Sequence, residues 1–419
     1  MKSSQFAIVP TRMWDGESDS IRSNAAVIIT HGIVVGIMSE CDLSQEIPKV
    51  RMPGCTLIPG FIDAHVHYTA VARLSFLLAG VTTVRDTGNG LSWILKEKEK
   101  SKQTPYSPRI YCCGILHDGG KYWNHIAKQF SDEKSLRTSI RNHVKRGVDQ
   151  IKLYADLPPH LFRVAVDEAH RHGKSVLAHL GKTSPEAAIA AGLDEIEHFD
   201  GCVVAQTRAP AKDIRTFVDL LCKHKVKTVP TLVVWDRLGR SLDLALRFDS
   251  RLELVHPILR QIWSRWRSRK QSPEHRLRSQ DLLPPVKRFT LSAHKAGILI
   301  GAGSDTPFIN LIPGFSLHDE ILHLMDSGLK PVDALKSATS VNAIIIGAKG
   351  KLGCIRAGAH ADLLAIEGNP LKRLEELTNI RAIWRNGIRL DMDFMRQQLL
   401  QAKHKRCDDP IIKDISTYK

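Results

Sequence analysis

The 419-residue sequence lacks three features that would assign it to a special class of proteins. No apolar run reaches the roughly 20 residues that a membrane-spanning helix needs, and residues 1–16 contain no signal-peptide core. None of the eight cysteines forms a Cys-x-x-Cys pair, which argues against a disulfide framework and against a zinc–cysteine site. These absences predict a cytoplasmic globular protein with reduced thiols and no membrane partner.

The chain has fewer acidic than basic residues, with 44 Asp and Glu and 60 Lys and Arg, which gives a net charge of +16. Segment 251–288 carries nearly half of this excess, with ten basic and three acidic residues. One interpretation is a solvated helical face or a mobile lid, and the other is an electropositive entrance for an anionic substrate. No nucleic-acid-binding motif accompanies the segment, so we expect a small-molecule substrate rather than a nucleic acid.

The entrance hypothesis makes a testable prediction about three arginines. Neutralising Arg265, Arg267 and Arg269 should raise KM for an acidic substrate more than for a neutral one, because steering acts only on charge. Steady-state kinetics on a matched substrate pair would measure this, and equal effects on both substrates would refute the hypothesis.

The most informative stretch is residues 57–68, LIPGFIDAHVHY, in which an apolar strand ends in His65-Val66-His67. Alternate side chains of a strand point to opposite faces, so the two histidines share one face. Two imidazoles on a rigid strand end can hold one divalent metal ion. Two incidental histidines are the alternative, but the preceding Pro-Gly break and Asp63 within the strand favour a site.

Strand-like and helical segments alternate along residues 57–346, which contain eight apolar strand-like runs, among them 81–86 and 226–235. This pattern predicts an α/β fold with a parallel sheet, and eight units predict a closed (β/α)8 TIM barrel. Shorter strand-like runs in 1–56 and 347–392 are predicted to pair as a small composite β-sandwich built from both chain termini. Residues 393–419 are predicted to form a C-terminal tail.

Further polar residues lie at or near the carboxyl ends of the later predicted strands. They are Lys152 in VDQIKLY, His179 in SVLAHL, His198 in LDEIEHFD and Asp305 in ILIGAGSD. In a barrel these ends meet at one mouth, whereas the outer strands of a doubly wound open sheet would lie too far apart to share a site. The pattern therefore favours the barrel and predicts one metal site.

Each of these residues also has a purely structural alternative. A single strand histidine is more often a hydrogen-bonded core residue than a ligand, and Lys152 could be a salt-bridged barrel lysine. Asp305 could cap a loop. The core alternative applies better to histidines on predicted helices, namely His170, His172, His224 and His294.

Seven stretches resemble the metal-dependent amidohydrolase superfamily in order and spacing, across nearly the whole chain. They are PGFIDAHVH, GVTTVRD, DQIKLY, VLAHL, EIEHFDG, GAGSD and GAHADLL. The chain is most similar to the binuclear branch, which includes prolidase-like dipeptidases and amide or urea hydrolases. This resemblance implies two divalent metal ions, usually zinc, bridged by a carboxylated lysine, which here is Lys152 carrying a CO2-derived carbamate.

The chemistry of the residues is compatible with such a centre. His65, His67 and Asp305 are predicted to bind the buried metal, and His179 and His198 the more exposed one, with the Lys152 carbamate between them. Two metals can share one bridging hydroxide, which would attack the carbonyl of a C–N bond. Asp305 would act as the general base and then as the proton donor to the leaving nitrogen.

Four residues are candidates for substrate contact. Tyr154 lies one pleat beyond Lys152 and faces the same side, and Trp123 and His125 belong to the loop 117–130. His318 lies in GFSLHDE, which resembles a recurring motif after the last barrel strand. Packing within the loops is the alternative for the last three.

Three functional classes remain open on the sequence. The first is a binuclear hydrolase of amide, peptide, carbamate or urea-type bonds, which Lys152 favours. The second is a mononuclear deaminase or cyclic-amide hydrolase of the imidazolone type, whose relatives lack a lysine in the fourth strand. The third is a scaffold or basic binding protein without catalysis, against which the six candidate ligands argue. A homo-oligomer is expected only by analogy with the family.

Overall fold

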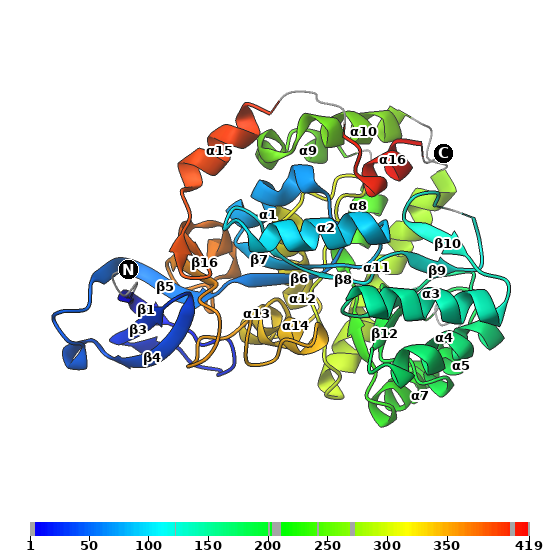
Figure 1. Ribbon diagram of the computed structural model, residues 1–419, viewed down its shortest axis with the longest axis horizontal. Helices are drawn as coiled ribbons and strands as arrows, with labels where there is room; N and C mark the ends of the chain where they lie inside the picture. The colour runs from blue at the N-terminus through cyan, green and yellow to red at the C-terminus, as the bar shows by residue number, and fades with distance from the viewer. Residues whose placement is uncertain are drawn as a thin grey trace.

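The computed structural model describes residues 5–121, 123–199, 202, 211–240, 243–268, 273–402 and 407–417. Three hydrogen-bonded sheets organise this part of the chain. A sheet rich in N-terminal strands lies at one end of the molecule, and the helices that follow the middle strands lie at the other end (Figure 1). The chain therefore folds as a mixed α/β protein.

The largest sheet combines strands from both ends of the chain. Its eight strands follow the order β17-β16-β15-β5-β1-β3-β4, with β2 paired to β1. β5 links the two halves, since it pairs parallel to β1 and antiparallel to β15. The strands are β1 (Phe6–Met13), β2 (Arg22–Ser23), β3 (Ala25–Thr30), β4 (Ile33–Ser39), β5 (Lys49–Pro59), β15 (Leu363–Glu367), β16 (Ile380–Arg385) and β17 (Ile388–Arg389).

Two parallel sheets occupy the middle of the chain. One has the order β6-β7-β8 and the other the order β10-β9-β11-β12-β13-β14. Most of these strands are rich in apolar residues, as expected where both faces of a strand are buried, whereas the edge strand β10 is largely exposed. The strands are β6 (Phe61–Val66), β7 (Val81–Asp86), β8 (Arg109–Cys112), β9 (Leu116–Asp118), β10 (Ala127–Gln129), β11 (Ile151–Leu153), β12 (Val176–His179), β13 (Glu195–Glu197) and β14 (Lys227–Val229).

Segment 298–306 lies between the outer strands of these two sheets. Thr228 of β14 forms a parallel bridge with Ile300, and Val66 of β6 forms one with Thr306. On the other side, Asp149 N, just before β11, donates to Cys112 O of β8 at 2.9 Å. Backbone hydrogen bonds therefore connect the two sheets through segment 298–306 on one side and through the start of β11 on the other.

Helices and short 3-10 turns connect and cover the strands (Figure 1). The α-helices are α1 (Arg73–Leu78), α2 (Leu91–Lys102), α3 (Glu133–Arg146), α4 (Pro159–Arg171), α5 (Pro185–Ala190), α7 (Ala211–Lys223), α8 (Leu232–Gly239), α9 (Leu244–Arg247), α10 (Pro257–Ser268), α11 (Pro273–Lys295), α12 (Phe315–Asp326), α13 (Pro331–Ser337), α14 (Ser340–Ile345), α15 (Met392–Leu400) and α16 (Pro410–Thr417). The 3-10 turns are η1 (Glu40–Asp42), η2 (Ala70–Ala72), η3 (Ser250–Leu254) and η4 (Leu374–Thr378).

One predicted strand is wrong in its second half. The apolar run 226–235 forms β14 only as far as Val229, and α8 begins at Leu232. The chain turns at Thr231, which has a left-handed backbone (φ 46°), and buried Glu320 of α12 accepts a hydrogen bond from Val233 N at 2.8 Å. The first N–H groups of a helix have no partner within the helix, and the Glu320 carboxylate accepts from one of them. This contact with another helix outweighs the β-branched composition of the run, which favours a strand.

The basic segment is largely helical, and the apolar side of its first helix is buried. Leu259, Ile262 and Trp263 of α10 are almost fully buried, while Arg265 is exposed. The side chain of Arg267 and the whole of Arg269 lie outside the described residues, so the predicted steering of acidic substrates stays a prediction.

Two further findings concern the composition. All eight cysteines are free thiols. Within the described ranges, no helix combines the length and the apolar character that crossing a membrane requires.

Candidate metal centre

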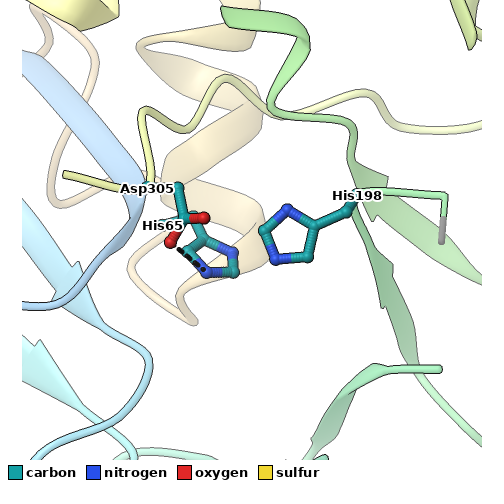
Figure 2. A group of neighbouring side chains, drawn as sticks. All are labelled: His65, His198 and Asp305. Carbon is teal, nitrogen blue, oxygen red and sulfur yellow. Dashed lines mark ion pairs between the residues drawn. The ribbon is translucent and has the colours of Figure 1, made fainter. Parts of the chain in front are cut away.

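The two parallel sheets bring the predicted ligands together. His65, His198 and Asp305 are buried, and each offers a ligand atom within 4.8 Å of the others (Figure 2). The His179 ring lies 4.9 Å from the His198 ring, centroid to centroid. His67 Nε2 lies 3.5 Å from Asp305 Oδ1. Strand ends far apart in sequence thus direct imidazoles and a carboxylate to one place.

Hydrogen bonds determine which nitrogen of the two strand-end histidines faces the centre. His67 Nδ1 lies 2.8 Å from Gly88 O, and a carbonyl can only accept, so this nitrogen carries the proton. His65 Nδ1 donates in the same way to the carboxylate of Glu197. The Nε2 atoms of both rings therefore carry free lone pairs. Burial, the largest cause, lowers the pKa of His67 to about 4 and that of His65 well below its usual value.

Asp305 Oδ1 faces these two lone pairs without forming a hydrogen bond to either of them. It lies 3.4 Å from His65 Nε2 and 3.5 Å from His67 Nε2, beyond the range of an O–H···N hydrogen bond. The atom is buried and has no hydrogen-bond partner among the described residues. In a tetrahedral site with metal–ligand bonds of about 2.1 Å, two ligand atoms lie roughly 3.4 Å apart, which matches these separations. Three acceptor atoms in this arrangement fit a divalent cation.

Lys152 is the second unpartnered polar group in the cluster. Its side chain is 1% exposed, and Nζ has no hydrogen-bond partner in the part of the chain that the structure describes. Burial, the largest cause, lowers the pKa of the amine. A lysine amine that loses its proton more easily is a better nucleophile toward CO2, so this environment fits carbamate formation.

The strands end in strained backbone where the ligands sit. His198 has φ 62° and Asp305 has φ 54°, and both are in the left-handed region that side chains rarely adopt. The His198 Nδ1 atom is 2.6 Å from Thr231 Oγ1, and Thr231 is itself left-handed at φ 46°. Such strain persists only where the surroundings enforce it, and it clusters at functional sites.

Asp63 and two small residues hold Asp305 against the His65 strand. Asp63, fully buried, accepts hydrogen bonds from Ser304 N at 3.0 Å and Ser304 Oγ at 2.5 Å. A Cβ at Gly303 would lie 2.6 Å from His65 Cβ, so only glycine permits this approach. The DAHVH and GAGSD motifs thus fit together as one unit.

A buried ionic network lies directly behind His65. Arg85 is fully buried and pairs with Glu195 and Glu197, at 3.0 Å from Nη2 to Glu197 Oε1. Arg85 therefore pairs with these two glutamates and not with Asp86, the next residue along β7. Asp86 instead accepts from Tyr68 N at 2.8 Å and Asn89 Nδ2 at 2.7 Å. Consecutive strand residues face opposite sides, which separates the two side chains.

Replacing Glu197 with glutamine should weaken metal binding by about 10- to 100-fold, the usual cost of losing a partner behind a ligand. A glutamine has one acceptor oxygen and cannot serve both His65 and Arg85. Equilibrium dialysis with metal analysis measures the effect. Glu168→Gln is the matched control, since Glu168 is a buried glutamate that pairs with Arg137 on another face. Equal affinities for wild type and Glu197→Gln would contradict the prediction.

Two of the four predicted substrate contacts lie beside the cluster. The Tyr154 ring is 4.8 Å from the His179 ring, and Trp123 Nε1 donates to Tyr154 Oη at 3.3 Å. Phe308, which the sequence did not single out, places its ring 5.3 Å from that of His67 and 5.7 Å from that of Trp123. These three rings form an aromatic wall next to the ligands.

The other two predicted contacts have different partners. His318 is buried in α12, with Nε2 2.7 Å from Ala79 O and its ring against Phe61. It fixes α12 to the end of α1. His125 Nδ1 lies 2.8 Å from Asp414 Oδ1 of α16, with 45% of its side chain exposed. It joins the loop to the C-terminal helix.

Comparison with known proteins gives a consistent family. The sequence profile of the amidohydrolase family matches residues 56–390. The ochratoxinase of Aspergillus niger is 23% identical over 448 residues, which cover 89% of this chain and 84% of that enzyme. The bottromycin amidohydrolase structure has a TM-score of 0.76 at 22% identity, over 96% of this chain and 91% of that one. A Xaa-Pro dipeptidase with bound methionine has a TM-score of 0.71 at 20% identity, over 93% and 100%.

Proposed function

The chain belongs to the amidohydrolase family and is an amide-bond hydrolase of that family, and from this premise we propose that it is a binuclear metal-dependent hydrolase of small molecules. The scissile bond is a C–N bond of an amide, peptide, carbamate or urea. His65, His67, Lys152, His179, His198 and Asp305 hold two divalent cations. Zinc suits this set, because imidazole and carboxylate oxygens are its common ligands.

The proposed architecture places these residues at one mouth. The two parallel sheets and segment 298–306 form a closed (β/α)8 barrel over residues 57–346. The strands of 1–56 and 347–392 form a separate β-sandwich domain. The hydrogen bonds that join 298–306 to β14 and β6 support closure, and a closed barrel explains why six ligands from five strand ends meet.

Each side chain of the site would have a distinct role in the reaction. Bound divalent cations supply Lewis acidity, which acidifies a water and polarises a carbonyl. Asp305 is the carboxylate nearest to the lone pairs of His65 and His67, so it takes a proton from the attacking water and passes it to the leaving nitrogen. The Tyr154 hydroxyl, held by Trp123, orients the polar end of the substrate. Glu197 and Gly88 keep the Nε2 atoms of the two histidines free.

One observation carries this proposal. Asp305 Oδ1 and the Nε2 atoms of His65 and His67 converge without a hydrogen bond between them, while the buried Lys152 amine beside them lacks a partner among the described residues. Leaving such groups unsatisfied costs about 1–3 kcal/mol each. Cations and a carbamate would remove all of these costs together, whereas a scaffold protein gains nothing from them.

Metal content and intact mass of the purified wild-type protein test the proposal. We expect two divalent ions per chain and a labile carboxylate adduct on Lys152 at neutral pH under CO2. Peptide mapping under the same conditions would locate the adduct. One ion and an unmodified Lys152 would favour the mononuclear deaminase or cyclic-amide alternative, and no ion after refolding with zinc would favour the scaffold.

A further inference from the structure

The last helix of the chain lies against the loops that border the metal centre. The family profile ends at residue 390, and residues 393–419 were predicted only as a tail. The described part of this region contains α15 and α16, and α16 packs next to α10 (Figure 1). Ile411, Ile412 and Ile415 of α16 are fully or almost fully buried, so this helix is part of the folded body.

The buried carboxylate of Asp409 fastens the start of this segment to the loop after His67. It accepts from Thr69 Oγ1 at 2.5 Å and from Ala70 N at 2.8 Å. Both donors lie within three residues of His67, and Asp409 is 7% exposed. A carboxylate that caps backbone N–H groups forms strong, charge-assisted hydrogen bonds.

The carboxylate of Asp414 fastens the helix to a second loop. It accepts from the backbone N atoms of Asn124, His125 and Ile126, at 3.0–3.2 Å, and from His125 Nδ1 at 2.8 Å. Asp414 is 3% exposed. The three consecutive amides directly follow Trp123, so Asp414 holds the backbone next to this tryptophan.

Helix α10 contacts both α16 and the segment that carries Phe308. Trp266 Nε1 donates to Ile415 O at 2.8 Å, and Trp263 Nε1 donates to Pro307 O at 3.0 Å. The Trp266 ring also lies 6.2 Å from the ring of Phe308. One apolar cluster therefore joins α16, α10 and two members of the aromatic wall, Trp123 and Phe308.

We propose that the segment Asp409–Ile415 is a specificity element, in which Asp414 positions Trp123 so that the aromatic wall selects substrates with a large apolar or aromatic group beside the scissile bond. This inference rests on the proposed hydrolase function. The Phe308 ring lies beside His67 and the Tyr154 ring beside His179, so the groups next to a C–N bond held at these ligands would contact the two rings. Aromatic rings in such a position favour apolar partners by burial and by edge or stacking contacts.

The test compares three amides that differ by one aromatic group. Acetyl-glycine is the reference, benzoyl-glycine carries the ring on the acyl side, and acetyl-phenylalanine carries it on the amine side. Wild type should show a higher kcat/KM for at least one aromatic compound, by about tenfold or more. Asp414→Asn should reduce this preference toward 1, mainly through KM, with unchanged metal content.

Two variants separate positioning from folding. Asp408→Asn is the matched control, because Asp408 directly precedes the segment and pairs with Lys413 at the surface, and it should keep the wild-type preference. Trp123→Leu should lose the preference like Asp414→Asn, while retaining metal and a cooperative thermal unfolding transition. If Asp414→Asn lowers kcat/KM equally for all three amides, or leaves the preference intact, the proposal is wrong.

A binding measurement separates this inference from the proposed function. Calorimetric titration with 3-phenylpropionate and with propionate needs no turnover. Wild type should bind the phenyl compound at least about tenfold more tightly, and Asp414→Asn should not. If the phenyl compound binds more tightly to wild type but no amide is hydrolysed, the proposed reaction is refuted and the specificity element is still supported. Equal binding of both acids by wild type would overturn the specificity element whatever the activity.

Discussion

Replacing Asp305 with asparagine should lower kcat by about 10²- to 10⁴-fold, the range expected when a general acid–base group is lost. Asparagine has nearly the same shape and keeps one oxygen toward His65 and His67, but it cannot accept and return a proton at neutral pH. The decrease should therefore fall on kcat, with little change in KM. Rates are measured at saturating metal on the best amide of the panel.

The control for this variant is Asp326→Asn on α12. Asp326 has an exposed side chain and pairs at 3.8 Å with Lys287, so its loss should leave both constants within about twofold of wild type, in line with the small contribution of surface ion pairs. Metal analysis of Asp305→Asn must accompany the kinetics. A variant that keeps metal and more than about a tenth of the wild-type kcat would exclude Asp305 as the proton carrier.

Much of the fold could be predicted because local sequence and tertiary environment agree. Residues 81–86, VTTVRD, form β7 over the predicted range, since a β-branched run between Gly80 and Gly88 suits a buried strand. The run 226–235 has a similar composition, but its second half is helical. A continuous apolar run carries no period that separates a buried strand from a buried helix, and the deciding cap, Glu320, lies 87 residues away.

The residues of the centre could be predicted for a related reason. Each candidate ligand is a polar residue at or near the end of an apolar strand, where packing alone would favour an apolar side chain. Their partners follow no such local rule. Glu197 reaches His65 across 132 residues, and Asp414 reaches Asn124 across 290. Phe308 looks like any core aromatic in the sequence, and only the fold brings it to His67.

Glu195 and Glu197 carried a recognisable pattern that the sequence interpretation did not use. Two glutamates two residues apart in the strand-like run LDEIEHFD share one face, and the run ends at His198. Buried carboxylates need a cation or hydrogen-bond donors, so this pattern could have indicated a buried basic partner. In the structure that partner is Arg85, and burial still raises the pKa of Glu195 to about 7. Local sequence thus predicts that the two glutamates share one face of the strand, but it does not predict which basic residue they pair with.

Replacing Lys152 with alanine should separate the binuclear proposal from its mononuclear alternative. Without the amine no carbamate can form, so we expect fewer than two divalent ions per chain. The activity should fall by more than about 100-fold, which exceeds the usual effect of losing a residue that only supports a metal ligand. Lys152→Met fills the same space without charge and should behave alike, which would exclude a cavity as the cause.

The alanine variant also allows chemical rescue. A short carboxylic acid such as propionate can enter the space left by the side chain and supply the two oxygens of the missing carbamate. Its addition should restore the second ion and part of the activity to Lys152→Ala, but not to Lys152→Met, where the space is filled, nor to Asp305→Asn, which lacks a different group. If Lys152→Ala keeps full metal content and activity, the lysine is only a buried structural amine, and the mononuclear alternative becomes the better account of the site.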